Sequence, residues 1–135
     1  MKKKILVGYD HSNTSQDALP LAKVHAHAFH AEVYLVTSMV SGTGDQQEII
    51  NAAAKGLAYA KDYFKKDGLA CETHLLIRGL SPGEDLVNFA KEHVVDEIIV
   101  GVKRRSRVGK FLTGSTTQYI ILMANCPVVS VRNLY

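Results

Sequence analysis

One stretch of the chain contains the residue types best suited to bind phosphate. It runs from Val100 and Gly101 through a basic loop to Gly114-Ser115-Thr116-Thr117. Glycines let a backbone approach an anion closely, and the free N–H groups of a helix's first turn point at it. The loop adds five cations, Lys103, Arg104, Arg105, Arg107 and Lys110. The sequence therefore predicts an anion site between residues 101 and 117.

Other site chemistry has weaker support. The chain has no G-x-x-x-x-G-K-[ST] phosphate loop. His25, His27 and His30 lie close in sequence, but positions 25 and 27 of a helix point about 200° apart, which disfavours a shared metal site. We expect Cys71 and Cys126 to be buried, reduced thiols. Because no residue is dedicated to activating water, we expect a binding protein with slow hydrolysis at most.

Strands and helices alternate along the chain and must position this stretch. Hydrophobic patterning predicts strands at 4–9, 31–38, 70–78, 97–100 and 128–131, with helices at 13–30, 46–66, 82–93 and 119–124. This order favours a parallel sheet covered on both faces, with right-handed crossovers. Ligands bind such sheets beyond the carboxyl ends of the strands, where the strand order reverses. Asp10 and Gly101, which end the first and fourth strands, are therefore candidate site residues.

Local signals predict how two of the helices begin. Ser12 or Asn13 is a good N-cap for the first, whereas Pro20 should kink that helix or mark a late start. Ser81-Pro82-Gly83-Glu84 predicts a helix start with serine at the N-cap, proline at the first position and a capping box.

Size and composition restrict the functional class. A chain of 135 residues is the size of one domain, residues 1–135, and 47% of it is hydrophobic. It contains no apolar run of membrane-spanning length and no signal peptide, so we expect a cytoplasmic protein. A formal charge of +3 is small, and the basic loop lacks interleaved aromatic residues. Nucleic acid is therefore not the expected partner.

Four features together resemble the universal stress protein family over nearly the whole chain. They are the first strand ending in Asp10, the long second helix, the G-L-S-P-G-E-D entry at 79–85 and the C-P-V-V-S-V ending at 126–131. The resemblance implies a flavodoxin-like, Rossmann-like three-layer α/β sandwich with a five-stranded parallel sheet of order 3-2-1-4-5. It also implies a homodimer through the last strand, residues 127–132, whose apolar edge invites pairing with a second copy.

The resemblance further implies a ligand, because many members of the family bind ATP. Their motif is G-x-x-G-x(9)-G-[ST]; Gly101 matches its first glycine, Gly114-Ser115 match its end, and Arg104 stands at its second glycine. The implied ligand is ATP or AMP; a magnesium ion can bridge its phosphates, although no carboxylate cluster specifies one. The residues to which the resemblance assigns contacts are Gly8, Asp10, Ser38, Val100, Gly101, Lys103, Arg104, Gly114, Ser115, Thr116 and Thr117.

Arg104 leaves two interpretations of the phosphate site open. A β-carbon disfavours positive φ, and strain of that kind costs about 1–3 kcal/mol. A guanidinium suits phosphate, however, and a charge-assisted contact contributes about 1.5–3 kcal/mol. Because Gly101 and Gly114-Ser115 remain, we favour retained binding by a stress-response sensor or regulator that acts on a protein partner. The alternative is a dimeric interaction module of the same fold in which Arg104 fills the phosphate site.

Several of these residues also have a simpler structural interpretation. Charge runs on loops are usually solvated surface and contribute little individually. Ser115 and Thr116 would cap a helix without any ligand, and Asp10 could serve only to cap the helix that follows it.

Overall fold

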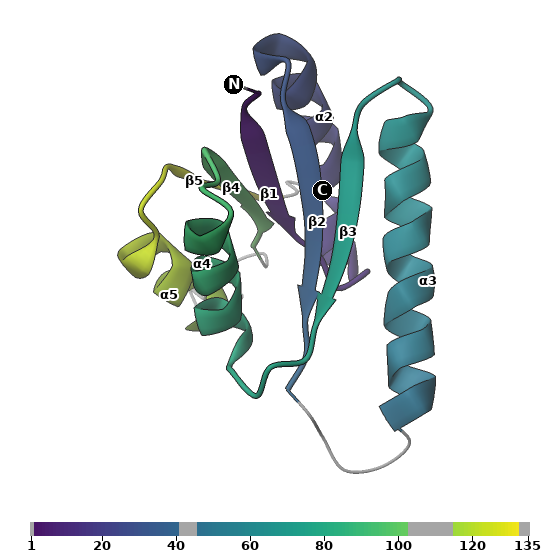
Figure 1. The fold of residues 1–135 in the computed structure, drawn as a ribbon, viewed down its shortest axis with the longest axis vertical. Coiled ribbons are helices and arrows are strands. Elements are labelled where there is room, and N and C mark those ends of the chain that lie inside the picture. The colour runs from purple at the N-terminus through teal and green to yellow at the C-terminus, as the bar shows by residue number, and fades with distance from the viewer. Residues whose placement is uncertain (1, 41–45, 103–114, 133–135) are drawn as a thin grey trace.

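The computed structural model describes residues 2–40, 46–102 and 115–132. In chain order its elements are β1 (Lys4–Gly8), α1 (Asn13–Gln16), α2 (Ala18–Phe29), β2 (Glu32–Ser38), α3 (Gln46–Lys65), β3 (Cys71–Leu76), α4 (Pro82–Glu92), β4 (Glu97–Gly101), α5 (Ser115–Met123) and β5 (Val128–Val131) (Figure 1). The strands and helices alternate as the sequence predicts. Within the described residues, no helix is both long and apolar enough to cross a bilayer.

All five strands are parallel, in the order β3-β2-β1-β4-β5. This order confirms the α/β fold class and the sheet topology expected from the sequence. β1 is central: Gly8 at its end pairs with Val36 of β2, and Val7 pairs with Ile99 of β4. The chain moves outward from β1 in opposite directions, through β2 to β3 and through β4 to β5. The order therefore reverses between β1 and β4.

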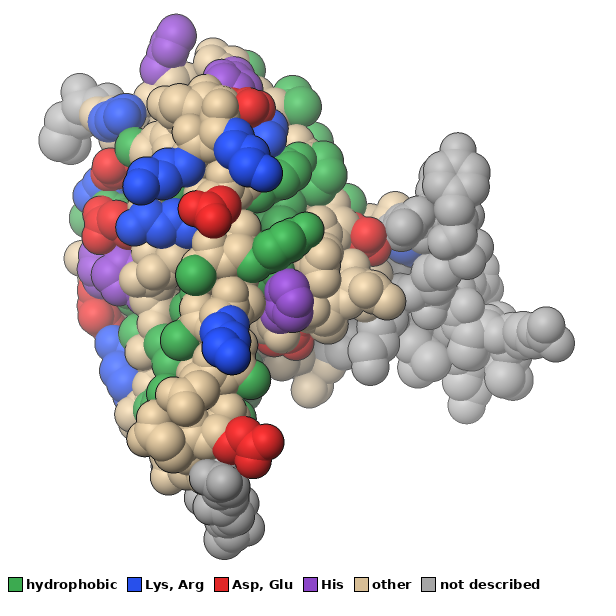
Figure 2. Space-filling view, turned by 90° about the vertical axis from the view of Figure 1, so that its right-hand side faces the viewer, with side chains coloured by type: hydrophobic (Ala, Val, Ile, Leu, Met, Phe, Trp, Pro, Cys, Tyr) green, Lys and Arg blue, Asp and Glu red, His purple; other side chains and the backbone are tan. Residues whose placement is uncertain are grey.

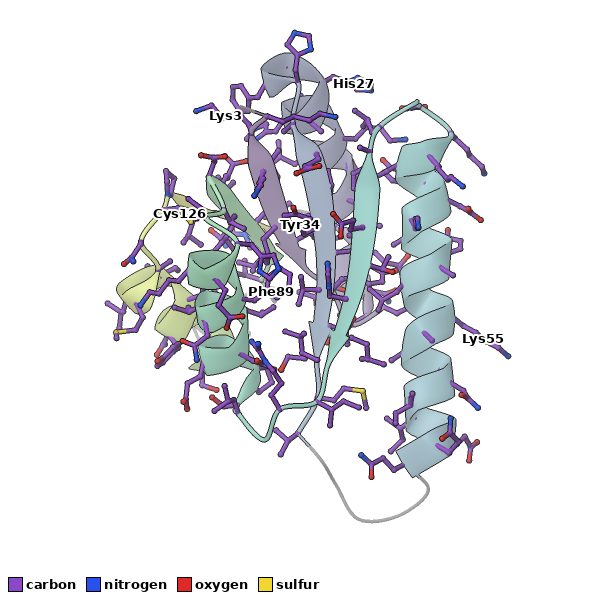
Figure 3. All side chains as sticks on the ribbon, in the orientation of Figure 1. Lys3, His27, Tyr34, Lys55, Phe89 and Cys126 are labelled. Carbon is purple, nitrogen blue, oxygen red and sulfur yellow. The ribbon has the colours of Figure 1, made fainter. Side chains whose placement is uncertain are left out.

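The sheet separates two apolar layers because alternate side chains of each strand point to opposite faces. On one face Ile5, Val7 and Val33 pack with the buried residues of α2 and α3, among them Phe64. On the other face lie α4 and α5, whose buried residues pack against a second set of strand side chains: Leu6, Tyr34, Val36, Ile98 and Val100. Tyr34 of β2 and Phe89 of α4 point toward each other there, with ring centroids 6.0 Å apart (Figure 3).

Pro20 marks a late helix start, one of the two outcomes its position predicts. Ser12 is the N-cap of α1, and its side chain accepts a hydrogen bond from the Ser15 N–H at 3.1 Å. α1 ends at Gln16 and α2 begins at Ala18, so that Pro20 occupies the third position of α2. Its missing N–H would have no intrahelical partner in the first turn, and the proline is tolerated there.

Three local expectations need correction. Ser81 and Pro82 begin α4 as predicted, but the capping box is wrong, because the Ser81 side chain caps no backbone N–H. Its hydroxyl instead hydrogen-bonds the Glu84 carboxylate at 3.0 Å. Cys71 and Cys126 are free thiols but only half-buried; desolvation still raises the pKa of Cys71 to about 12. The final helix begins four residues earlier than expected, at Ser115.

Candidate functional site

A cavity of about 490 Å³ opens where the strand order reverses. It lies beyond the carboxyl ends of β1, β2 and β4, between the first turns of α4 and α5. Its described lining comprises Gly8, Tyr9, Asp10, Ser12, Thr14, Ser15, Val36, Ser38, Pro82, Leu86, Val100, Gly101, Val102, Ser115, Thr116, Thr117 and Ile120. Drug-sized ligands occupy pockets of roughly 300–1,000 Å³, so this cavity can take a small molecule.

Most of the candidate residues from the sequence come together in this cavity. Those that line it are Gly8, Asp10, Ser38, Val100, Gly101, Ser115, Thr116 and Thr117. Lys103, Arg104 and Gly114 lie outside the described residues. The contacts of all these residues with a ligand remain predictions, but residues from four separate segments share one space.

Packing within the protein requires a glycine at position 101, whether or not a ligand binds. A β-carbon at this position would lie 1.8 Å from the carbonyl oxygen of Thr14, which is impossible without movement of the backbone. Gly8 is less constrained, because a β-carbon there would lie 3.3 Å from Leu86 Cδ1 and 3.4 Å from Val100 Cγ1. The backbone of α1 therefore packs directly on the end of β4 beside the cavity.

Asp10 is held by the segment that follows it. Its Oδ1 accepts a hydrogen bond from the Ser12 N–H at 3.0 Å, and its own N–H donates to Ser15 Oγ at 3.3 Å. Partial burial would raise the pKa of this carboxyl, but the hydrogen bonds from Ser12 and Ser15 outweigh it and lower the pKa below 3.8. Ser12 is the N-cap of α1, so Asp10 is not. At neutral pH Asp10 is thus a fixed anion that can only accept hydrogen bonds.

Ser38, at the end of β2, belongs to a polar network around the buried Asp85. Its Oγ donates to Asp85 Oδ2 at 2.7 Å, and Arg78 Nε donates to Asp85 Oδ1 at 2.6 Å. Arg78 also donates to the Asp85 carbonyl at 3.3 Å and contacts the Glu92 carboxylate at 3.3 Å. The Asp85 side chain is fully buried. The hydrogen bond to this carboxylate raises the pKa of Arg78.

Sequence reasoning missed Asp85, although a signal for it exists. Asp85 stands one residue before Leu86 and four before Phe89, all three on the buried face of α4. A carboxylate on the apolar face of a predicted helix requires a partner, because an unpaired buried charge is costly.

The cavity has donors at one end and acceptors at the other. α5 begins at Ser115, and its first turn contains no acidic residue. Its free N–H groups and the hydroxyls of Ser115, Thr116 and Thr117 offer hydrogen bonds at a terminus with partial positive charge. Toward the other end, Asp10 follows β1 and Ser38 ends the neighbouring strand β2, and both present oxygen atoms. The arrangement suits a ligand with an anionic group at one end and donors at the other.

The histidines of α2 have structural partners. His25 Nδ1 contacts Glu97 Oε1 at 2.8 Å, and His27 lies 3.8 Å from Asp67. Among the described residues, no group of three metal-ligating side chains could hold an ion.

A second, open hollow lies between α1 and α3. It is lined by His11, Gln16, Ala52, Lys55, Gly56 and Tyr59 and was not expected from the sequence. Figure 2 looks onto the side of the molecule that carries α3; Lys and Arg side chains alternate there with Asp and Glu. The described part of this face therefore has no continuous basic patch for nucleic acid.

Comparison with known proteins gives one family. The model of the universal stress protein family matches residues 1–132. A universal stress protein of Thermus aquaticus is 29% identical over 139 residues, covering 98% of this chain and all of that protein. A universal stress protein structure from Archaeoglobus fulgidus is 34% identical, with a TM-score of 0.87 and coverage of 97% of this chain and 99% of the other.

Related structures contain adenine nucleotides. A universal stress protein from Archaeoglobus fulgidus in complex with dAMP is 30% identical, with a TM-score of 0.78 and coverage of 97% and 98% of the two chains. Two more distant structures, solved with cAMP and with AMP, are 24% and 16% identical and show the likeness in fold alone.

Proposed function

Because this chain belongs to the universal stress protein family, we propose that its cavity binds an adenine nucleotide, AMP or ATP, as the input of a stress-response regulator. One observation carries the proposal. Predicted nucleotide contacts from β1, β2, β4 and α5 line a single cavity at the switch point of the sheet. A relative that is 30% identical over nearly the same length is in complex with dAMP.

The polarity of the cavity supports one orientation of the nucleotide. The phosphate lies at the N-terminus of α5, where Ser115, Thr116 and the free backbone N–H groups donate. The base extends toward β2, across the apolar side chains of Val36 and Leu86. Asp10 accepts a hydrogen bond from a ribose hydroxyl between the two ends.

The lining favours binding over turnover. Asp10 is the one carboxylate among the described lining residues, and one of its oxygens is already held by the Ser12 N–H. General base catalysis requires a proton acceptor placed at the attacking water with a pKa near the working pH, whereas the pKa of Asp10 is lowered. Hydrolysis is therefore slow at most, and a partner protein responds to occupancy of the site.

The protein acts as a homodimer through the segment 127–132. β5 ends the sheet order, so one of its edges has no neighbouring strand among the described residues. Beside it, the outer face of α5 exposes Ile121, Leu122 and Met123. An unpaired apolar edge next to exposed apolar side chains is suited to a second copy.

Isothermal titration of the purified protein with AMP and ATP, with and without Mg²⁺, tests the proposal. We expect one saturable site per chain, with an affinity that Ser115→Ala reduces about fivefold, since a hydrogen bond contributes about 1 kcal/mol. Ser130→Ala, the same substitution on an exposed residue of β5 outside the cavity lining, serves as the matched control and should bind as the unmodified chain does. No heat of binding with either nucleotide would refute the proposal.

A further inference from the structure

We propose that Asp85 is a positioning residue that makes the cavity selective for a purine with an amino group at position 6. Asp85 does not line the cavity. It acts through Ser38, which does, and this inference rests on the proposed nucleotide site. The inference is based on the direction of the hydrogen bond between Ser38 Oγ and Asp85 Oδ2. The charge of the Asp85 carboxylate determines that direction.

The Asp85 carboxylate can only accept hydrogen bonds. It is fully buried, and Arg78 Nε donates to its Oδ1 at 2.6 Å. The remaining oxygen, Oδ2, lies 2.7 Å from Ser38 Oγ. A charged carboxylate has no proton to give, so the proton of this bond belongs to Ser38. Turning that proton away would leave a buried charge without one of its partners, which is costly.

The hydrogen bond to Asp85 limits what the Ser38 hydroxyl can offer to a ligand in the cavity. Its single hydroxyl proton is committed to Asp85, so toward a ligand the oxygen has only lone pairs. Ser38 and Ser115 both line the cavity. Ser38 ends β2, which lies on the side of β1 away from β4. A nucleotide whose phosphate lies at α5 reaches this side with its base.

The base must therefore bring a donor to Ser38. The exocyclic amino group at position 6 of adenine is such a donor, whereas the carbonyl oxygen at the same position of hypoxanthine or guanine is an acceptor. Two facing acceptors cannot form a hydrogen bond, and a buried polar group left unpaired is a strong basis for discrimination. We expect the protein to bind AMP about tenfold more tightly than IMP, the scale of one such mismatch.

The test compares dissociation constants for AMP, IMP and purine riboside 5′-monophosphate, which keeps N1 of adenine and lacks the amino group. Ser38→Ala removes the acceptor, so the preference for AMP over the other two should fall toward onefold. Asp85→Asn places an amide where it can donate to Ser38 Oγ and free the hydroxyl proton for the ligand. In that variant the AMP-to-IMP preference should disappear or reverse, which a merely structural role of Asp85 would not cause.

Glu92→Gln is the matched control, because Glu92 also contacts Arg78 at 3.3 Å but has no contact with Ser38. Its preference for AMP should equal that of the unmodified chain. Thermal melting identifies any variant that fails to fold. If Asp85→Asn fails to fold, the AMP-to-IMP preference of Ser38→Ala tests the inference instead. Tight binding of IMP to the unmodified chain, or a preference that Ser38→Ala leaves unchanged, would overturn the inference while the nucleotide site stands. Failure of all three nucleotides and of ATP to bind would overturn both.

Discussion

The carbonyl oxygen of Thr14 lies directly against the Cα of Gly101, so close that a β-carbon there would be 1.8 Å from it. This contact joins α1, the helix that follows β1, to the end of β4, and the strand order reverses between β1 and β4. Glycine at position 101 is thus required for folding before any ligand is considered.

Gly101→Ala should therefore destabilise the protein in the absence of nucleotide. Overpacking against a backbone atom forces a shift of α1 or β4, with a cost of about 1–3 kcal/mol or more. Chemical denaturation of the ligand-free protein measures this cost. Gly8→Ala should lose less stability than Gly101→Ala. Its β-carbon would meet only the side chains of Leu86 and Val100, at 3.3 and 3.4 Å. Equal stability of Gly101→Ala and the unmodified chain would show that the Thr14 contact does not exist in solution.

Arg78→Ala should cause a large loss of stability, because it leaves the buried Asp85 carboxylate without its guanidinium. Removing one partner of a buried ion pair costs about 3–5 kcal/mol, and the partial exposure of Arg78 places this case toward the lower end. Glu92→Ala removes the exposed contact of the same arginine and should cost less than about 1 kcal/mol. Urea unfolding measures the loss of unfolding free energy in both variants. Similar losses would contradict the larger contribution assigned to the contact between Arg78 and Asp85.

The Asp10 carboxylate should contribute to stability in a pH-dependent way. Its pKa in the folded state lies below 3.8 because hydrogen bonds from Ser12 and Ser15 outweigh partial burial. A lowered folded pKa means that the contribution is fully present above the unfolded pKa and is lost as the pH falls through the folded value. The difference in unfolding free energy between the unmodified chain and Asp10→Asn should therefore be constant near neutrality and shrink below about pH 4. A difference that grows on acidification would contradict this assignment.

Ser130→Pro should abolish the proposed dimer and leave the monomer folded. The carbonyls of Pro127 and Val131 accept hydrogen bonds from the N–H groups of Ile98 and Val102, so both face β4. With the two-residue period of a strand, Val128 and Ser130 direct their backbone groups to the free edge. Proline at Ser130 removes an outward donor that a second copy would need. Analytical ultracentrifugation should find a monomer, with Ser130→Ala as the dimeric control; a dimeric proline variant would exclude this edge as the interface.

The sequence predicts the fold well, for physical reasons that particular residues illustrate. Ile98, Ile99 and Val100 form a short apolar run that ends at Gly101, and a run of this kind favours a strand that is buried on both faces. Pro20 predicts either a kink or a late helix start, because a proline lacks the N–H that the interior of a helix needs; the structure has the late start. Positions and types of elements follow from local patterns of this kind, whereas ends such as Ser115 and Leu76 were misplaced by a few residues.

The site was predictable in part. Asp10, Gly101 and Ser115 are found from glycines, polar residues and strand ends, all of which are local signals. Local signals do not reveal the pair of Arg78 and Asp85, because this pairing depends on how the end of β3 meets α4 in space. The contact between Thr14 and Gly101 likewise joins residues that are distant in the chain, and a glycine alone does not say what approaches it. Pairings between separate elements are thus the part that required the structure.

A crystal structure of the protein grown in excess ATP tests the proposed nucleotide site directly. We expect the phosphates at the first turn of α5, beside Ser115 and Thr116, and the base beside Ser38 at the end of β2. A cavity that stays free of nucleotide and holds the chain's own Arg104 guanidinium in the phosphate position would contradict it.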